Sequence, residues 1–202
     1  MHFEPIRVVR LQGPPVSPIK MKAVPLLLIA ALSMHGHATP SGRHDCPRVG
    51  KSVPAASVKI DFLGAGSEVQ FHSLADAEGL RAFLAHAGRE RAYIDEIPSE
   101  GGPPIIESVF TDQADSDPAK ELFVLVRWEV RHYGLQTEGN LFELLIYDDA
   151  LTAGGCGLKQ ITRLARSFGT GFDGLQEGTR VHYRFKNAPA IRKHLRALGF
   201  NK

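Results

Sequence analysis

The chain has 202 residues, of which 43% are hydrophobic, and it carries 24 basic and 22 acidic side chains. Residues 1–38 hold four of the basic side chains and one of the acidic ones, so the remaining residues have 20 basic and 21 acidic side chains. A chain of this length can bury the core of one domain, and without a basic excess it lacks the general attraction to phosphates that nucleic-acid binding requires. DNA and RNA are therefore not expected as partners.

The beginning of the chain has the pattern of a secretion signal. Met21 and Lys22 form a charged start, Ala23–Leu32 is apolar, and small residues precede a cleavage site after Ala38. The apolar stretch is about half as long as the roughly 20 residues that span a membrane, so export without a membrane anchor is expected, into the periplasm or the medium. The expected segments are an upstream stretch before the true start (1–20) and a signal peptide (21–38).

Cys46 and Cys156 both remain after cleavage, and in an oxidising compartment they are expected to form a disulfide. Closing so long a loop would stabilise the fold by about 4 to 5 kcal/mol. Two unpaired thiols stay open as the alternative, because a sequence does not show whether the two Cα atoms come within about 7 Å. The charged residues just before Cys46 argue against lipid attachment there. We expect a linker over 39–56 and one domain over 57–202.

The first half of this domain is predicted to combine strands with one helix. Val58, Ile60 and Phe62 alternate with polar residues, and glycines then turn the chain into a hairpin partner. A capping pattern at Ser73, followed by apolar residues with helical spacing from Leu80, predicts a helix that ends at Gly88. The segments predicted after it are a loop (98–104), a short strand (105–110) and an acidic turn (112–118).

The second half is predicted to contain the centre of the sheet. Residues 121–132 are apolar on both faces for half their length, which indicates a central strand, and 141–147 are its expected antiparallel neighbour. Residues 158–168 fit either a helix or a short strand, and both remain open. A last strand over 181–185 precedes a helix capped by Asn187, with Leu198 among its inward residues. The expected fold class is α+β: a single domain with a mostly antiparallel sheet and two or three helices packed on it.

Gly169, Gly171 and Gly174 match the spacing of a dinucleotide-binding loop, but turn dipeptides and a strand follow where that motif needs a helix. We therefore interpret this segment as a glycine-permitted loop. Because binding residues favour loops on rigid scaffolds, the loop is the predicted partner-binding site, with Phe172 and Asp173 exposed between Gly171 and Gly174.

No catalytic or metal motif stands out. The histidines are scattered, and the acidic run from Asp112 to Asp117 lacks the glycine and the glutamate of a calcium loop. The pairs Asp95–Glu96 and Asp148–Asp149 are acidic, but adjacent residues on a strand point to opposite faces. No cofactor and no metal are expected.

Three stretches carry a resemblance to known proteins: Leu122–Glu129, Phe172–Gly174 and Tyr183–Lys186. They resemble small exported proteobacterial proteins of uncharacterised function. The resemblance implies a periplasmic, non-enzymatic binding protein, an inhibitor or immunity protein against an envelope-acting enzyme or toxin. The alternative is an envelope hydrolase that lacks a short recognisable motif.

Overall fold

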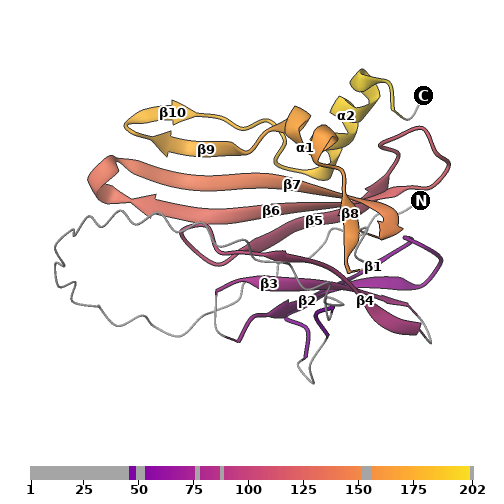
Figure 1. Ribbon diagram of the computed structural model, residues 1–202. Coiled ribbons are helices and arrows are strands. Elements are labelled where there is room, and N and C mark those ends of the chain that lie inside the picture. The colour runs from indigo at the N-terminus through magenta and orange to yellow at the C-terminus, as the bar shows by residue number, and fades with distance from the viewer. Residues whose placement is uncertain (1–45, 49–52, 76–77, 87–88, 152–155, 201–202) are drawn as a thin grey trace, which may run out of the picture.

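The computed structural model describes residues 46–48, 53–75, 78–86, 89–151 and 156–200. They form one domain with three layers, in which two antiparallel sheets lie face to face and two helices cover the outer side of the second sheet (Figure 1). The predicted α+β class is therefore confirmed. The first 38 residues, and with them the predicted upstream stretch and signal peptide, lie outside the described residues.

The first sheet has four strands in sequence order, each antiparallel to its neighbours. The predicted hairpin at its start is confirmed, with β1 paired to β2. The strands are β1 (Ala56–Ile60), β2 (Ser67–Ser73), β3 (Leu80–His86) and β4 (Arg89–Ile97).

The second sheet has the order β10-β9-β7-β6-β5, and β8 pairs with the far end of β7. The predicted central strand is confirmed with the bounds that the sequence indicated, since β6 lies between β5 and the long strand β7. The elements are β5 (Ile105–Asp112), β6 (Glu121–His132), a short turn of 3-10 helix (Tyr133–Leu135), β7 (Thr137–Leu151), β8 (Leu158–Gln160), α1 (Thr162–Phe168), β9 (Gly171–Gln176), β10 (Thr179–Val181) and α2 (Ala188–Leu198).

The helix predicted from Ser73 to Gly88 is wrong, because its middle is strand β3. Leu80, Phe83 and Leu84 have helical spacing, but Ala82 is also buried, and Leu80, Ala82 and Leu84 together face the core with a period of two. Phe83 is buried on the opposite face, where its ring meets those of His72 and Tyr93 edge-on. A strand buried on both faces contains apolar residues at every spacing, so periodicity alone could not separate it from a helix.

Two apolar clusters hold the layers together, and β6 contributes to both. Leu122, Val124 and Val126 face the first sheet, whereas Phe123 and Leu125 face the helices. All five are essentially inaccessible to solvent. The second sheet is thus the middle layer of the domain, and this explains why its central strand was readable as a continuous apolar run.

The C-terminal segment agrees in part with its prediction. Residues 158–168 contain both of the open alternatives, β8 followed by α1. The strand predicted over 181–185 is wrong in its bounds, because β10 is Thr179–Val181 and residues 182–185 are irregular, although Tyr183 and Phe185 still point into the core. Helix α2 begins as predicted, with the Asn187 side chain accepting a hydrogen bond from the Ala190 N–H at 3.0 Å. Leu198 is not inward as predicted, since it is 46% exposed.

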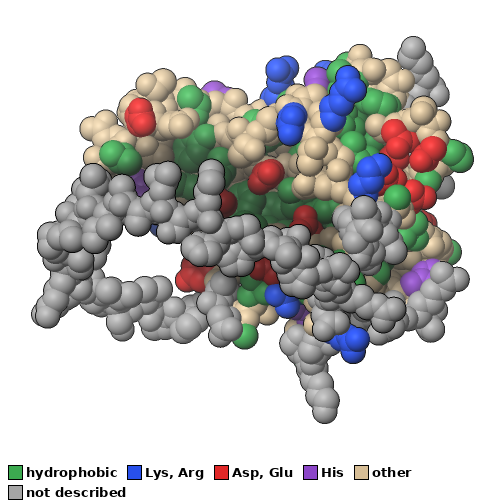
Figure 2. Space-filling model, in the orientation of Figure 1, with side chains coloured by type: hydrophobic (Ala, Val, Ile, Leu, Met, Phe, Trp, Pro, Cys, Tyr) green, Lys and Arg blue, Asp and Glu red, His purple; other side chains and the backbone are tan. Residues whose placement is uncertain are grey.

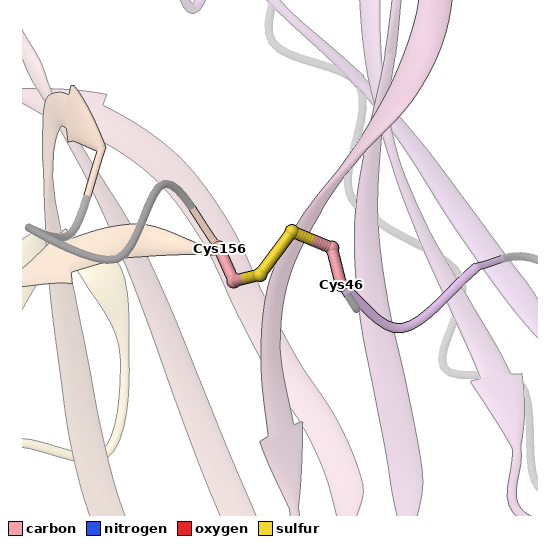
Figure 3. Close-up of a disulfide and its surroundings, with 2 residues drawn as sticks. All are labelled: Cys46 and Cys156. Carbon is pink, nitrogen blue, oxygen red and sulfur yellow. A yellow bond between two sulfur atoms is a disulfide. The ribbon is translucent and has the colours of Figure 1, made fainter. Parts of the chain in front are cut away.

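The predicted disulfide joins Cys46 to Cys156, with the two Cα atoms 5.2 Å apart (Figure 3). It links the segment before β1 to the segment before β8, so it ties the chain ahead of the first sheet to an edge of the second. Among the described residues, no helix is long and apolar enough to span a bilayer.

Candidate functional site

The predicted partner-binding loop is not a loop. Gly171–Gln176 is strand β9, which pairs with β7 on one side and with β10 on the other. Phe172 and Asp173 are half-buried, so the prediction that both are exposed is wrong as well. Their partner-binding role stays a prediction, and their contacts explain why the segment needs its glycines.

Gly174 faces Gly139 of β7, and the two backbones lie so close that neither residue can carry a side chain. A Cβ on Gly174 would lie 2.4 Å from the Glu138 carbonyl oxygen, and one on Gly139 would lie 2.5 Å from the Asp173 carbonyl oxygen. The ring of Phe172 lies over this pair, since the same Cβ on Gly139 would meet its Cε1 at 2.8 Å. The ring of Phe172 thus covers the backbone of these two glycines, which have no side chains of their own.

Gly171 has a different reason to be glycine. A Cβ there would lie 1.9 Å from Cδ2 of Tyr183, whose ring packs directly over this position and stacks on Phe142 with 5.8 Å between centroids. The Tyr183 hydroxyl donates to the carbonyl oxygens of Phe168 and Gly169 at the end of α1. Burial raises the pKa of Tyr183 to about 12, so the hydroxyl stays protonated as a donor at neutral pH.

Asp173 joins β9 to the chain that follows β10. Its carboxylate accepts hydrogen bonds from the Lys186 ammonium at 2.9 Å, from the Tyr183 N–H at 3.3 Å, and lies 3.3 Å from Nδ1 of His182. The ion pair with Lys186 is the main reason that the pKa of Asp173 lies below its usual range. A carboxylate with this many partners fixes the local fold.

The exposed apolar residues near this strand lie instead at two adjacent turns and the strand end beside them, which we name the hairpin tip. Tyr133 is 76% exposed, Leu135 63% and Leu175 37%. The turns lie side by side at the left end of the second sheet, beyond the helices (Figure 1). The hairpin tip consists of Tyr133, Leu135 and Gln136 of the β6–β7 turn, Leu175 near the end of β9, and Glu177 and Gly178 of the β9–β10 turn.

Backbone hydrogen bonds lock the two turns of the hairpin tip together. The Gly178 N–H donates to the Gln136 carbonyl oxygen at 3.1 Å, and the Glu177 N–H donates to Oγ1 of Thr137 at 3.1 Å. Gln136 and Glu177 both have left-handed backbone conformations, with φ of 48° and 49°. The tip is therefore a connected structure, and its exposed side chains stand on a defined backbone.

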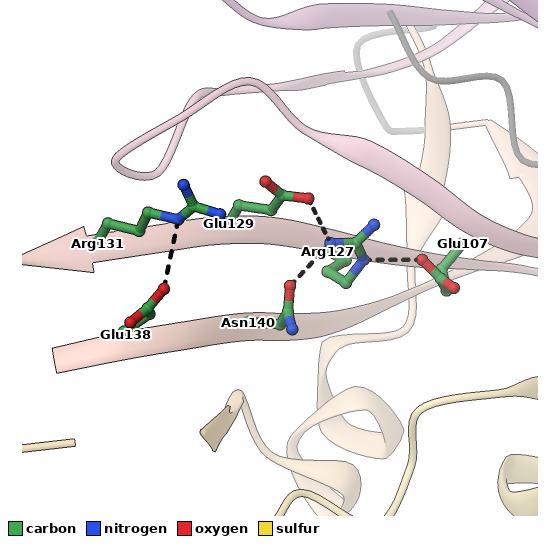
Figure 4. A network of polar contacts seen from close by, with 6 residues as sticks. All are labelled: Glu107, Arg127, Glu129, Arg131, Glu138 and Asn140. Atoms are coloured by element: carbon green, nitrogen blue, oxygen red, sulfur yellow. Dashed lines mark hydrogen bonds and ion pairs between the residues drawn. The ribbon is translucent and has the colours of Figure 1, made fainter. Parts of the chain in front are cut away.

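A ladder of charged side chains stiffens the strands that lead to the hairpin tip (Figure 4). Arg127 of β6 donates to Glu107 at 2.9 Å, to Asn140 at 2.7 Å and to Glu129 at 3.3 Å, so it links three neighbouring strands. Nearer the tip, Arg131 lies 3.8 Å from Glu138. On this face of the sheet the ladder replaces the apolar contacts that hold the helix-covered half.

A second polar cluster gathers around the acidic turn between β5 and β6. Asp115, Asp117 and Glu121 place carboxylate oxygens within 4.8 Å of one another, and Asp117 is equally close to Asp148 and Asp149. Asp148 and Asp149 thus do not follow the alternation of a regular strand, and the pairing of β7 with β8 is irregular at this point. Their mutual hydrogen bond raises the pKa of Asp149. Oxygen ligands of this kind suit a hard divalent cation, and in the described part of the chain only carboxylates form such groups.

Glu121 is the buried member of that cluster, with only 1% of its surface exposed. Its carboxylate accepts a hydrogen bond from the Ala114 N–H, which fastens the acidic turn to β6. Burial raises the pKa of Glu121 to about 7, and the nearby Asp115 and Asp117 add to the rise. Near neutral pH the Glu121 carboxyl group is therefore partly protonated and partly ionised.

A third cluster lies where β4 faces β7. The Tyr147 hydroxyl donates to Asp95 at 2.9 Å, and burial raises the pKa of nearby Glu143, with Glu100 and Asp95 adding to the rise. Asp95 thus acts on Glu143 and not on Glu96, whose carboxylate binds Arg81 at 2.8 Å. Two carboxyl groups that influence each other in this way are a feature of many hydrolase active sites.

Comparison of the chain with protein-family models, with curated proteins and with solved structures gives no match. The geometry of the described residues therefore has to indicate the site, and it favours the hairpin tip as the candidate binding site. Sequence reasoning missed it, although one signal was present: Tyr133 and Leu135 are large apolar residues in a turn between two strands, where polar residues are usual.

Proposed function

We propose that this chain is an exported, non-enzymatic binding protein that contacts a protein partner through the hairpin tip. One observation carries the proposal: of the six large apolar side chains that the described residues expose, Tyr133 and Leu135 lie on the β6–β7 turn and Leu175 lies near the end of β9, beside a second turn that is bonded to the first. Exposed apolar groups that cluster in this way mark interaction sites, whereas single ones need no explanation.

The construction of the hairpin tip suits the insertion of a rigid element into a concave site. Its backbone is held by the bonds between Gly178 and Gln136, and the ladder around Arg127 stiffens its strands, so little conformational entropy would be lost on binding. Tyr133 supplies an aromatic anchor of the kind that dominates interface energies. An inhibitor or immunity protein that blocks an envelope-acting enzyme or toxin fits this construction.

Export is part of the proposal. The disulfide between Cys46 and Cys156 supports it, because such bonds persist in oxidising compartments and are rare in the reducing cytosol. The pattern of residues 21–38 and the resemblance to exported proteobacterial proteins point the same way.

The test compares two double variants in a pull-down from envelope extract. Tyr133→Ser with Leu135→Ser removes the apolar groups of the hairpin tip. Val53→Ser with Leu198→Ser is the matched control, since it also removes two exposed apolar side chains. A partner retained by the wild type and the control should be retained at least about tenfold less by the tip variant. Equal retention by all three proteins would contradict the proposal.

The cluster around Glu143 favours a second candidate, an envelope hydrolase. Glu143, whose pKa is raised by burial, would act as the general acid, and the Tyr147 hydroxyl would hold Asp95 in place as the second carboxyl group. Under this alternative, Glu143→Gln would abolish release of soluble fragments from purified peptidoglycan while leaving partner capture by the hairpin tip unchanged. Wild-type protein that releases no fragments would rule out peptidoglycan hydrolysis.

A further inference from the structure

The charges of this protein are divided between two parts of the fold. Residues 158–200, which form the helices, β8 and the β9–β10 hairpin, carry nine lysines and arginines but only two acidic residues, Asp173 and Glu177. Residues 46–157 have the opposite balance, with 18 acidic and nine basic residues. The near-zero net charge of the chain therefore conceals a strongly dipolar molecule.

Most of the basic side chains in the C-terminal part are not used within the fold. Lys159, Lys186 and Arg192 each pair with an aspartate. The other six are exposed, and no carboxylate among the described residues pairs with them, although the Arg184 guanidinium lies over the Phe185 ring, 5.1 Å from its centroid. We name these six the basic layer: Arg163, Arg166, Arg180, Arg184, Lys193 and Arg196.

The basic layer occupies one side of the molecule. Figure 2 shows lysine and arginine side chains gathered over α1 and α2 at the top, with the acidic side chains beside and below them. Neither helix contains an acidic residue. Like charges at this density repel one another, so an arrangement of this kind costs stability unless an anion offsets it.

From this charge complementarity we infer that the basic layer binds the surface of an anionic phospholipid bilayer. Five of its six members are arginines, whose planar guanidinium groups bind phosphate oxygens in pairs. Each Lys or Arg near such a surface contributes about 1 kcal/mol of attraction, so several spread over two helices and a hairpin are sufficient for peripheral binding without an inserted segment.

The composition of the same face favours a lipid surface over an acidic protein. The other exposed residues of α1 and α2 are Thr162, Ser167, Pro189, Ala197 and Leu198, and none of them is an aromatic residue that could anchor a desolvated interface. Arg180 pairs with Leu175 beside the hairpin tip, but Arg163, Arg166, Lys193 and Arg196 lie on the helices, so the inference can be tested on residues apart from the tip. Membrane binding and partner binding can therefore succeed or fail separately.

The test is co-sedimentation of the purified protein with vesicles of phosphatidylcholine and phosphatidylglycerol in a two-to-one ratio. The protein carries the N-terminus that remains after processing in the cell. The test variant changes Arg163, Lys193 and Arg196 to Gln. The matched control changes Arg48, Lys59 and Lys120 to Gln, which removes the same charge from exposed positions elsewhere. Both variants keep the same N-terminus, so any difference between them reports on the basic layer.

The expected result is that the wild type and the control bind these vesicles, and that the apparent affinity of the test variant falls by about a hundredfold. Binding should also weaken as salt is added and should be absent with pure phosphatidylcholine. Equal loss in both variants, or equal binding to neutral vesicles, would overturn the inference. A wild type that does not bind the vesicles would also overturn it, including one that instead self-associates or binds an acidic protein or a nucleic acid through the same three residues.

Discussion

The two halves of the helix-side face of the second sheet are held together by different forces. From Phe123 to Leu125 this face is apolar and covered by α1 and α2, whereas from Arg127 onward it is charged and bridged by ion pairs. The change occurs within one strand and without a break in its pairing to β7. The covered half therefore stabilises the fold, whereas the uncovered half extends the sheet into a stiff arm that carries the hairpin tip.

The largest effect expected from this comparison is a difference between two alanine variants on the same face of β6. Leu125→Ala should lower the free energy of unfolding by about 2 to 5 kcal/mol, because it leaves a cavity in a fully buried cluster. Glu129→Ala should change it by less than about 0.5 kcal/mol, because the Glu129 side chain is 43% exposed and Arg127 keeps its bonds to Glu107 and Asn140. Urea unfolding measures both values. Similar losses of unfolding free energy in the two variants would mean that the charged ladder stabilises the fold as much as the apolar core does, which would contradict the comparison.

The next effect concerns Glu121 and the acidic turn. Its pKa is raised from 4.5 to about 7, so the folded protein holds this proton more tightly than the unfolded chain does. Stability should therefore fall as the pH rises from about 4.5 to 7, by an amount on the order of 2 to 3 kcal/mol, and level off above pH 7.

Glu121→Gln gives the measurement, because the amide oxygen can still accept the Ala114 N–H but carries no charge. This variant should lack that part of the slope of unfolding free energy against pH, and it should be more stable than the wild type at pH 8. An identical slope in the two proteins would show that Glu121 does not titrate in this range.

A smaller effect is expected at Asp173 of β9, which lies beside Asn140 and so at the level of Glu129 in the charged half of the sheet. Asp173→Asn should cost about 0.5 to 1 kcal/mol, since the exposed Lys186 limits what its ion pair contributes. The pKa of Asp173 is lowered in the fold, so its stabilisation is present above about pH 4 and is lost as the pH falls through the folded value. The difference between variant and wild type should therefore shrink on acidification, and a constant difference would refute the ion-pair account.

The sequence predicted the fold best where one local rule acted alone. The start of α2 follows from the capping residue Asn187, and β6 follows from its apolar run. Prediction failed at β3, where apolar residues on both faces imitate helical spacing, and at β9, where glycines required by close packing resembled a loop. In both cases the deciding contacts come from strands distant in the sequence.

The same reason limited prediction of the candidate site. The glycines around Phe172 led to the prediction of a partner-binding loop there, but these glycines are needed because β9 packs closely against β7. The hairpin tip depends on Gln136 meeting Gly178 across two turns, a contact that no local pattern shows. The basic layer was hidden as well, because a balanced total does not show how charges are divided in space.

The central claim is that the hairpin tip contacts a partner, and site-specific photo-crosslinking in living cells tests it most directly. A photoreactive amino acid replaces Tyr133 in one protein and Leu63, which is 49% exposed in a different turn, in another. We expect one discrete higher-mass adduct from position 133 and none from position 63. No adduct at position 133, or the same adducts from both positions, would contradict the account.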